Sequence, residues 1–571
     1  MATYFLSANR ESVQEDPFLL LLSGGSILGL WSDLHPDPGV AGHYGVYGRI
    51  WAGDLSGAGL ADAPVPDLTD DIQRSPSATG FADGGFAVTF ESRGASARDG
   101  TDDPYYDTYV KFYDADGAQR GEARQVTRNL GEDQRAAGIV TLSNDQSITL
   151  VARHVGAGDY DLVAYRHGAE GRTIGGGRKL VEDAGVYVSS LTGAGYNHPD
   201  IAAGARGTYA VAWHERVDLG DDRKGYAVKA RVFEADGAPV SAERVIAPVI
   251  RSETETFGLE QVAPKLTGRD AGGYAIAWDR EKSDSGSGRD VYFRLLDAEG
   301  APATRAVRVN TDRKSNDQFV EDVVDLGRGN TLVTYSTTIP DAFDDIFDGH
   351  HLMGRVMGPD GRWLTKSFRI TEEIQNEFGG GNTVVNARGE LVSTYSAELS
   401  YAMSEDVLIT SRALTLPWRD GGRGDEVLRG TLVNDRISGG AGDDRIHGAT
   451  GDDSLSGGTG DDTLYGNDGD DTLVGGRGDD RLVGGAGDDR LRGGPGEDVF
   501  VFTGGGRDVV EGFRRGTDLL EIGGASRDDI RELLASGRQH RADAVLDLGG
   551  GDSIRLKGTD LADLALSDFL L

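Results

Sequence analysis

The sequence predicts an all-β chain made of a seven-bladed β-propeller, a parallel β-roll and a small C-terminal cap. Three observations lead to this prediction. Strand-like segments recur about every 60 residues over residues 1–418, a nine-residue pattern of Gly and Asp fills residues 421–501, and short strand patterns resume after it. We therefore expect three parts, at residues 1–418, 419–502 and 503–571.

The first part is marked by a strand that ends in a large residue and then turns polar. This marker recurs at steps of 59, 62, 61, 65, 57 and 60 residues, at Trp31, Phe90, Ala152, Trp213, Trp278, Tyr335 and Tyr395. Each copy has room for four strands, and turns such as DADG and EADG are typical of hairpins. Seven four-stranded copies predict a seven-bladed propeller, whose ring leaves no long edge exposed. A seven-unit solenoid and two sandwiches remain as alternatives.

The last copy has three clear strands and lacks a fourth. A strand pattern at residues 3–8, TYFLSA, belongs to no copy of its own. We expect it to pair with the last copy and close the ring.

The nine-residue pattern runs through nine blocks from Gly421 to Val501 without an insertion. Position 1 is Gly in every block and position 4 in eight, which indicates positive φ or no room for a Cβ atom. Position 8 is apolar throughout, so each block can place one side chain in a core. A disordered Gly/Asp linker is the alternative, but it would not explain an apolar residue every nine positions.

Position 6 is Asp in eight blocks and Glu426 in the first. Stacked turns would bring these carboxylates to about one strand spacing, near 4.8 Å, where like charges repel. A hard cation between turns would remove the conflict. Carboxylates and the carbonyls of a glycine-rich turn suit Ca²⁺, whereas Mg²⁺ demands a tighter octahedron and zinc prefers nitrogen or sulfur.

The blocks resemble the GGxGxDxUx repeats of the RTX family, which form a parallel β-roll with Ca²⁺ between turns. The resemblance implies that the position-6 carboxylates are calcium ligands, together with carbonyls of the turn glycines. The expected ligands are Asp444, Asp453, Asp462, Asp471, Asp480, Asp489 and Asp498. The second block has Thr431, Leu432 and Val433 in its turn, so Glu426 and Asp435 stay outside this set. The acidic residues at position 5 are expected to face solvent.

Composition limits the partners. The 94 acidic and 58 basic residues give a net charge of −36, which disfavours nucleic acid and anionic lipid surfaces. No cysteine is present, which excludes disulfides and thiolate chemistry. No segment has the length and apolarity of a membrane span, and the N-terminus lacks the pattern of a secretory signal peptide.

The RTX resemblance implies an extracellular protein exported by type I secretion machinery, which reads a C-terminal signal. The last residues, LKGTDLADLALSDFLL, are acidic and apolar like the endings of that family. A final segment that packs on the roll is a second interpretation, and the two are compatible. Residues 507–524 resemble the segment that caps such rolls, followed by a short helix at 529–536 and a hairpin at 544–558.

The role of the propeller is open between two classes. Polar residues after the marker strands are expected to gather on one face, and His214, Glu215, Asp279 and Glu281 are the candidates for contacting a ligand. Solvated rim residues would produce the same pattern. The motifs HExxH and GxSxG and the P-loop are absent. We expect an extracellular module that binds a glycan or cell-surface ligand, with a polysaccharide hydrolase or lyase as the alternative.

Overall fold

A computed structural model describes residues 2–5, 14–34, 44–52, 63–64, 72–93, 105–127, 133–156, 159–168, 171–186, 199–218, 224–251, 264–281, 289–310, 318–339, 349–371, 377–378, 381–386, 388–398, 405–416, 419–503 and 505–570. It divides into two compact units. One comprises residues 1–384 and 392–412, and the other comprises residues 385–391 and 413–571.

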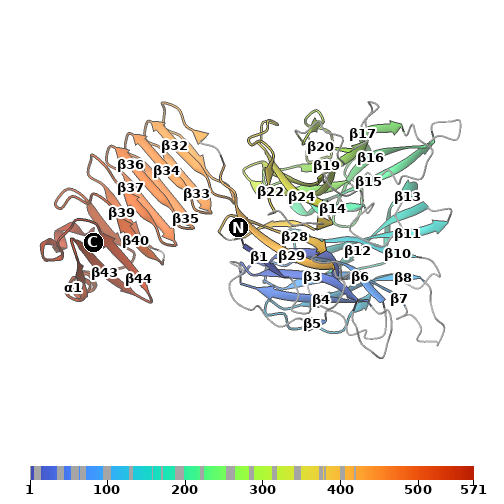
Figure 1. The fold of residues 1–571 in the computed structure, drawn as a ribbon, viewed down its shortest axis with the longest axis horizontal. Coiled ribbons are helices and arrows are strands. Elements are labelled where there is room, and N and C mark those ends of the chain that lie inside the picture. Colours follow the sequence, from blue (N-terminus) through green and yellow to red (C-terminus); the bar gives the residue numbers. More distant parts are fainter. Residues whose placement is uncertain are drawn as a thin grey trace. The chain divides into compact units, whose positions relative to one another are not determined.

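The first unit is a propeller of seven antiparallel blades, as the sequence predicts (Figure 1). Blades 1 to 3 are consecutive meanders. Blade 1 comprises β2 (Gln14–Leu21), β3 (Ile27–Leu34), β4 (Tyr44–Trp51) and β5 (Ala63–Pro64). Blade 2 comprises β6 (Ile72–Gly80), β7 (Phe86–Arg93), β8 (Tyr106–Tyr113) and β9 (Arg124–Gln125). Blade 3 comprises β10 (Gln134–Thr141), β11 (Ser147–Gly156), β12 (Asp159–His167) and β13 (Arg178–Val186).

Blades 4 to 6 repeat the arrangement. Blade 4 comprises β14 (Asp200–Ala203), β15 (Tyr209–Asp218), β16 (Lys224–Phe233) and β17 (Arg244–Arg251), with a short 3-10 helix, η1 (Ala205–Gly207), after its first strand. Blade 5 comprises β18 (Lys265–Gly268), β19 (Tyr274–Glu281), β20 (Arg289–Leu296) and β21 (Val307–Arg308). Blade 6 comprises β22 (Gln318–Gly327), β23 (Asn330–Ile339), β24 (Gly349–Met357) and β25 (Phe368–Arg369).

Blade 7 is built from both ends of the propeller sequence. It comprises β26 (Glu377–Phe378), β27 (Thr383–Val385), β28 (Glu390–Glu398), β29 (Glu405–Ala413) and the N-terminal β1 (Ala2–Phe5). Strand β1 pairs antiparallel with β29, from Ala2 opposite Ser411 to Phe5 opposite Leu408. Residues 6–8 of the expected strand lie outside the described residues. The pairing closes the ring at the place where the sequence lacks a fourth strand.

Apolar clusters between neighbouring blades hold the ring together. The marker residues described with their side chains, from Trp31 to Tyr335, are all buried. At the closure of the ring, Leu19, Ile27 and Trp31 of blade 1 pack with Val392 and Ile409 of blade 7. Such burial stabilises the ring by roughly 25 cal/mol per Å² of apolar surface.

A side-chain amide adds to the closure. The Asn382 Oδ1 atom accepts a hydrogen bond from the Leu19 backbone N–H at 2.6 Å, and the Asn382 Nδ2 atom donates to the Leu19 carbonyl at 2.8 Å. One side chain thus links the two blades that the chain ends bring together.

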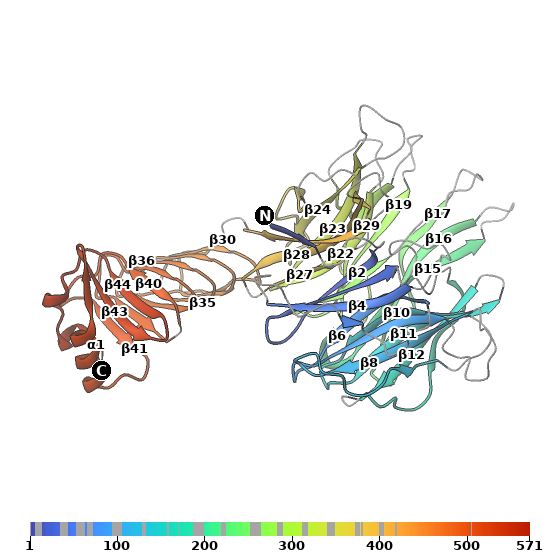
Figure 2. The ribbon, with the colours of Figure 1, turned by 60° about the horizontal axis from the view of Figure 1, so that its bottom comes forward.

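The second unit begins with two parallel sheets (Figure 2). Sheet 1 contains β31 (Val427–Arg429), β33 (Arg445–Thr450), β35 (Thr463–Asp468), β37 (Arg481–Ala486), β39 (Val499–Phe502) and β41 (Leu519–Ile522). Sheet 2 contains β30 (Arg419–Asp420), β32 (Arg436–Ala441), β34 (Ser454–Thr459), β36 (Thr472–Arg477), β38 (Arg490–Arg492) and β40 (Arg507–Val510). Within the repeats each strand pairs with the strand 18 residues away, as Leu455 does with Leu473, and the last pairs are 19 residues apart in sheet 2 and 20 in sheet 1.

One coil of the roll therefore spans two nonapeptides, and successive blocks lie in opposite sheets. The position-8 side chains of all nine blocks are buried in one continuous core. This is the core that the nine-residue period predicts.

The cap completes sheet 2 with β44 (Asp552–Leu556), β43 (Asp543–Gly549) and β42 (Arg538–His540), and adds α1 (Arg527–Ser536), η2 (Leu561–Asp563) and η3 (Leu566–Asp568). The helix begins with a capping box, in which the Ser526 hydroxyl accepts from the Asp529 backbone N–H. Its Ile530 and Leu533 join the apolar core of the roll. The expected helix and hairpin are both present.

We predict that deletion of residues 1–10 lowers the melting temperature of the propeller, on the order of 5 °C or more, because it removes the fourth strand of blade 7. Calorimetry of the otherwise complete chain measures this effect. Removal of Met1 alone is the control and should leave the transition in place. Unchanged melting after the larger deletion would show that β1 contributes nothing to closure.

Candidate metal centre

The position-6 carboxylates form two buried rows, one for each sheet. Row A precedes the strands of sheet 1 and contains Asp444, Asp462, Asp480, Asp498 and, in the cap, Asp518. Row B precedes the strands of sheet 2 and contains Asp435, Asp453, Asp471 and Asp489, and it continues after the repeats with Asp508 in β40. All ten side chains are at most 5% exposed.

In every one of these carboxylates except Asp435, the Oδ1 atom accepts a hydrogen bond from the neighbouring coil. The Asp462 Oδ1 atom accepts from the Asp444 backbone N–H at 2.8 Å, and the Asp471 Oδ1 atom accepts from the Asp453 N–H at 2.7 Å. The same bond repeats along both rows. It orients every carboxylate in the same way, so the second oxygens also lie in line.

The second oxygen is buried without a hydrogen-bond partner in six of these residues. They are Asp444, Asp453, Asp462, Asp471, Asp480 and Asp489. A buried carboxylate oxygen with no partner is costly, and the cost grows when like charges follow at each coil.

The electrostatic consequence appears in the pKa values. Burial, the largest cause, and neighbouring carboxylates raise the pKa of Asp471 to about 9 and that of Asp453 to about 8. The same causes raise the pKa of Asp480 and Asp489 to about 7. Without a cation, the pKa values of Asp471 and Asp453 therefore favour the protonated form at neutral pH.

The donor chemistry fits a hard divalent cation. Each row offers carboxylate oxygens at successive coils, next to backbone carbonyls of glycine turns, and Ca²⁺ accepts six to eight such oxygens. Among the described residues no group of three or more His, Cys, Asp or Glu side chains converges. The remaining ligands would be main-chain carbonyls.

The glycines are explained by the same geometry. At position 1, a Cβ atom on Gly475 would collide with the Oδ2 atom of Asp480 in the same block. At position 4, Gly478 has φ of 124° and packs against the coil before it. Position 1 thus lacks space for a Cβ atom, and position 4 both lacks space and has positive φ.

Position 2 has a backbone requirement that the sequence reasoning missed. It also adopts positive φ, with 94° at Ala449 and 77° at Asn467. The available signal was that six blocks carry Gly there and one carries Asn, the residue that best tolerates this region after Gly.

The ends of the rows differ from their middles. The Asp435 Oδ2 atom accepts from the Thr431 N–H at 2.6 Å and from the Thr431 hydroxyl at 2.8 Å. This departure from the repeat therefore satisfies the carboxylate with hydrogen bonds. At the other end, the Asp498 Oδ2 atom lies 3.3 Å from the guanidinium of Arg514. Asp498 is the one predicted ligand for which the structure provides a cationic side chain.

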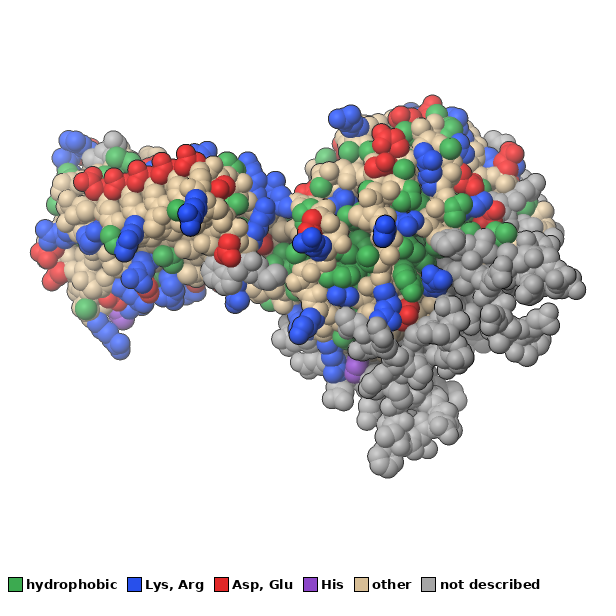
Figure 3. All heavy atoms as spheres, turned by 90° about the horizontal axis from the view of Figure 1, so that it is seen from above, with side chains coloured by type: hydrophobic (Ala, Val, Ile, Leu, Met, Phe, Trp, Pro, Cys, Tyr) green, Lys and Arg blue, Asp and Glu red, His purple; other side chains and the backbone are tan. Residues whose placement is uncertain are grey.

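The position-5 acids are exposed, as expected. They form a ladder of their own, in which the Asp461 Oδ1 atom accepts from the Asp479 N–H at 2.8 Å. Acidic side chains run in a line along this unit in the space-filling view (Figure 3).

The candidate ligand-contacting residues of the propeller are engaged in its own structure. Asp279 is buried, and its Oδ1 atom accepts from the Val320 N–H of the next blade at 2.6 Å. Burial raises its pKa to about 8. Glu91, one residue after its own marker, makes the equivalent bond to the Ala136 N–H at 3.1 Å. Both carboxylates link neighbouring blades.

His214 and Glu215 lie side by side in β15 but differ in environment. The imidazole of His214 is buried edge-on against Tyr226, and burial lowers its pKa to about 4. Glu215 pairs with the Lys229 ammonium at 2.6 Å. The side chain of Glu281 lies outside the described residues. The described members of this set thus belong to separate contacts and do not converge on one site.

No helix in the described part of the chain is long and apolar enough to cross a membrane.

Comparison with known families matches the roll. The model of the RTX calcium-binding nonapeptide repeat (4 copies) matches residues 420–455, 447–482 and 474–510. No curated protein matches the chain.

Several solved structures are similar to the chain at low identity. One is a protein of unknown function from Dyadobacter fermentans DSM 18053, 13% identical over 62% of this chain and 97% of that chain, with a TM-score of 0.37. Another is an ulvan lyase of polysaccharide lyase family PL25, 10% identical over 72% and 98%, with a TM-score of 0.44. A third is the Trypanosoma rangeli sialidase in complex with the inhibitor DANA, 9% identical over 70% and 55%, with a TM-score of 0.36.

RTX repeats bind Ca²⁺ and are typical of secreted proteins. Residues 420–510 are RTX calcium-binding nonapeptide repeats, and the same chain carries a seven-bladed β-propeller before them.

Proposed function

We propose that this chain is an extracellular protein whose roll folds when Ca²⁺ binds between its coils, after export by type I secretion machinery. The observation that carries the proposal is the set of six buried Oδ2 atoms without a partner. The residues that would hold Ca²⁺ are Asp444, Asp453, Asp462, Asp471, Asp480 and Asp489, with carbonyls of the turn glycines. Bound Ca²⁺ would supply the positive charge that the stacked carboxylates lack.

The order of export and folding follows from the difference in Ca²⁺ concentration between the cytosol and the outside of the cell. At cytosolic calcium concentrations the rows of carboxylates repel, and the roll remains unfolded and able to pass a narrow exporter. Outside the cell, modules of this kind bind Ca²⁺ at roughly 10⁻⁴ to 10⁻³ M, and binding supplies the free energy of folding. The net charge of −36 adds repulsion that Ca²⁺ reduces.

The C-terminal segment supports this order. The Asp568 and Phe569 side chains are buried in the folded cap, and the Leu570 N–H donates to the Leu520 carbonyl at 2.8 Å. An export signal in this segment would be accessible while the chain is unfolded and covered once the cap has formed. The two interpretations of the tail thus describe successive states of one segment.

We assign the propeller to extracellular binding or adhesion. Polar groups at the ends of marker strands, which a catalytic centre would use, hold neighbouring blades together, as Asp279 and Glu91 do. Calcium-loaded full-length protein on arrays of glycans and on intact cells tests this role. Saturable binding without turnover of the bound glycan supports it, and cleavage of a polysaccharide would replace it with an enzymatic one.

Calcium titration tests the main proposal. Circular dichroism of metal-depleted protein should gain β signal as Ca²⁺ rises to about 1 mM, and calorimetry should register several bound ions. A chelator should reverse the change. The absence of any response to Ca²⁺ would remove both the metal sites and the folding mechanism.

Neighbouring aspartates provide a matched pair of variants. Asp471→Asn keeps the Oδ1 acceptor for the Asp453 N–H and removes the charge from the partnerless oxygen, so the Ca²⁺ concentration for half-saturation should rise at least about tenfold. Asp470→Asn, in the exposed ladder, should leave this concentration nearly unchanged. Equal effects from the two variants would show that the buried row holds no metal.

The stability of the metal-free roll should fall as the pH rises, which is the opposite of what we expect for the calcium-loaded roll. The pKa of Asp471 rises from 3.8 to about 9 and that of Asp453 to about 8, so the folded roll binds protons that the unfolded chain releases. This contribution to stability is complete below pH 4 and is lost as the pH rises toward 9. The metal-free roll should therefore gain β structure as the pH falls from 8 to 5, because proton uptake removes the charge of the buried carboxylates.

Circular dichroism at the two pH values measures this difference. With saturating Ca²⁺ the order should reverse, because protons compete with the metal for the same oxygens. A metal-free roll that is more stable at pH 8 would contradict the prediction.

A further inference from the structure

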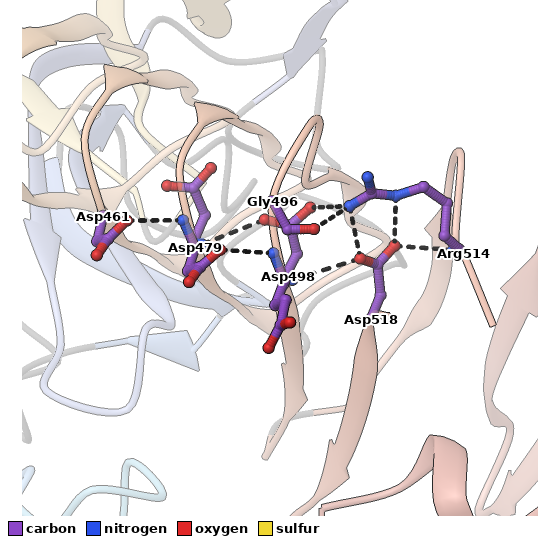
Figure 4. A network of polar contacts seen from close by, with 8 residues as sticks. Asp461, Asp479, Gly496, Asp498, Arg514 and Asp518 are labelled. Carbon is purple, nitrogen blue, oxygen red and sulfur yellow. Dashed lines mark hydrogen bonds and ion pairs between the residues drawn. The ribbon is translucent and has the colours of Figure 1, made fainter. Parts of the chain in front are cut away.

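The last coil of row A contains a cation that belongs to the protein itself. Arg514 lies between β40 and β41, and its guanidinium reaches back to the final nonapeptide (Figure 4). Its Nη2 atom donates to the carbonyl of Gly496, to the Asp498 Oδ2 atom at 3.3 Å and to the Asp518 Oδ1 atom at 2.7 Å. One nitrogen thus contacts a position-4 carbonyl and two successive carboxylates.

Asp518 is the next member of row A although it lies outside the repeats. Its Oδ1 atom accepts from the Asp498 N–H at 3.4 Å, as Asp498 Oδ1 does from the Asp480 N–H at 3.2 Å. The following strand β41 pairs in parallel with β39, from Leu519 opposite Val499. Arg514 therefore lies between two successive carboxylates of row A. We call the space between two such carboxylates a step of the row.

The contrast with the preceding steps is in the second oxygen. In Asp444, Asp462 and Asp480 this oxygen is buried and has no partner. At Asp498 the equivalent oxygen faces the guanidinium, and the Asp518 Oδ2 atom also accepts from the Arg514 backbone N–H at 2.8 Å. The donor set is of the same kind at each step, and the last step alone has a positive side chain in it.

We propose that Arg514 is the resident cation of the last step in row A, in the position that Ca²⁺ takes at the earlier steps. This inference rests on the proposed function, in which those earlier steps bind Ca²⁺. Arginine suits the role because it stays charged at all relevant pH values and directs several N–H donors at carboxylate and carbonyl oxygens together.

The position of Arg514 also links it to the cap. Phe513, next to Arg514, packs against Phe500 at a centroid distance of 6.2 Å, and Leu520 of β41 joins the same core. The guanidinium thus fixes the loop that covers the last apolar layer of the roll. The last step thus needs no metal ion of its own once the roll has folded, whereas the steps before it require Ca²⁺.

The stoichiometry of calcium binding tests the inference. We compare wild-type protein with Arg514→Met, which keeps the side-chain length and removes the charge, and with Arg515→Met as the matched control. Arg515 pairs with the exposed Asp563 at 3.2 Å and lies outside the row. Equilibrium dialysis with ⁴⁵Ca²⁺ on the full chain counts the bound ions, and circular dichroism during a Ca²⁺ titration reports the Ca²⁺ concentration that folding requires.

Arg514→Met should bind one Ca²⁺ more than wild type and should need a higher Ca²⁺ concentration to fold, whereas Arg515→Met should match wild type in both. If Arg514→Met fails to fold at any Ca²⁺ concentration, Arg514→Gln is measured, which keeps amide donors without the charge, and the same extra ion is expected. An unchanged number of ions in the folded variant overturns the inference and leaves the calcium sites intact. A wild-type protein that binds no Ca²⁺ instead overturns the proposed function.

Discussion

Repulsion between stacked carboxylates is the constraint on which the roll depends. Two unit charges at one strand spacing repel by roughly 3 kcal/mol at the effective dielectric constant of a protein. The two rows place such neighbours at every coil and bury them, as with Asp453 and Asp471. Hydrogen bonding satisfies one oxygen of each and cannot remove the charge. The folded roll therefore needs bound protons or cations. Its stability depends on the pH and on the Ca²⁺ concentration.

The propeller obeys a different constraint. Its stability comes from apolar clusters between blades, in which Trp31, Trp213 and Trp278 are fully or almost fully buried. Some of its polar side chains also pair across blades, as Asn382 does with Leu19. A ring of this kind requires closure more than it requires an ion, and β1 provides it. The chain thus joins a propeller that is stabilised by apolar packing to a roll whose folding depends on Ca²⁺ or protons from the solution.

The sequence predicts the features that repeat along the chain. It does not predict the environment of a side chain that depends on a residue distant in sequence. The nine-residue period identifies the buried apolar residue of each block, and the marker residues identify the second strand of each blade. The period cannot say that coils contain 18 residues, because blocks n+1 and n+2 look alike in sequence. Likewise, a polar residue after a strand can face solvent or the next blade. Asp279 and His214 are buried inside the propeller, and only the position of the neighbouring blade decides this.

At one end of each row of carboxylates the sequence departs from the nonapeptide pattern. Row B starts at Asp435, whose free oxygen is taken by the backbone and hydroxyl of Thr431, a residue that replaces the usual glycine of position 2. Row A ends at Arg514, which contacts the last carboxylates and the carbonyl of Gly496. On the proposal made above, neutral donors close one row and a fixed cation closes the other. The number of metal steps is then set by these terminal residues, and the number of nonapeptides gives only its upper limit.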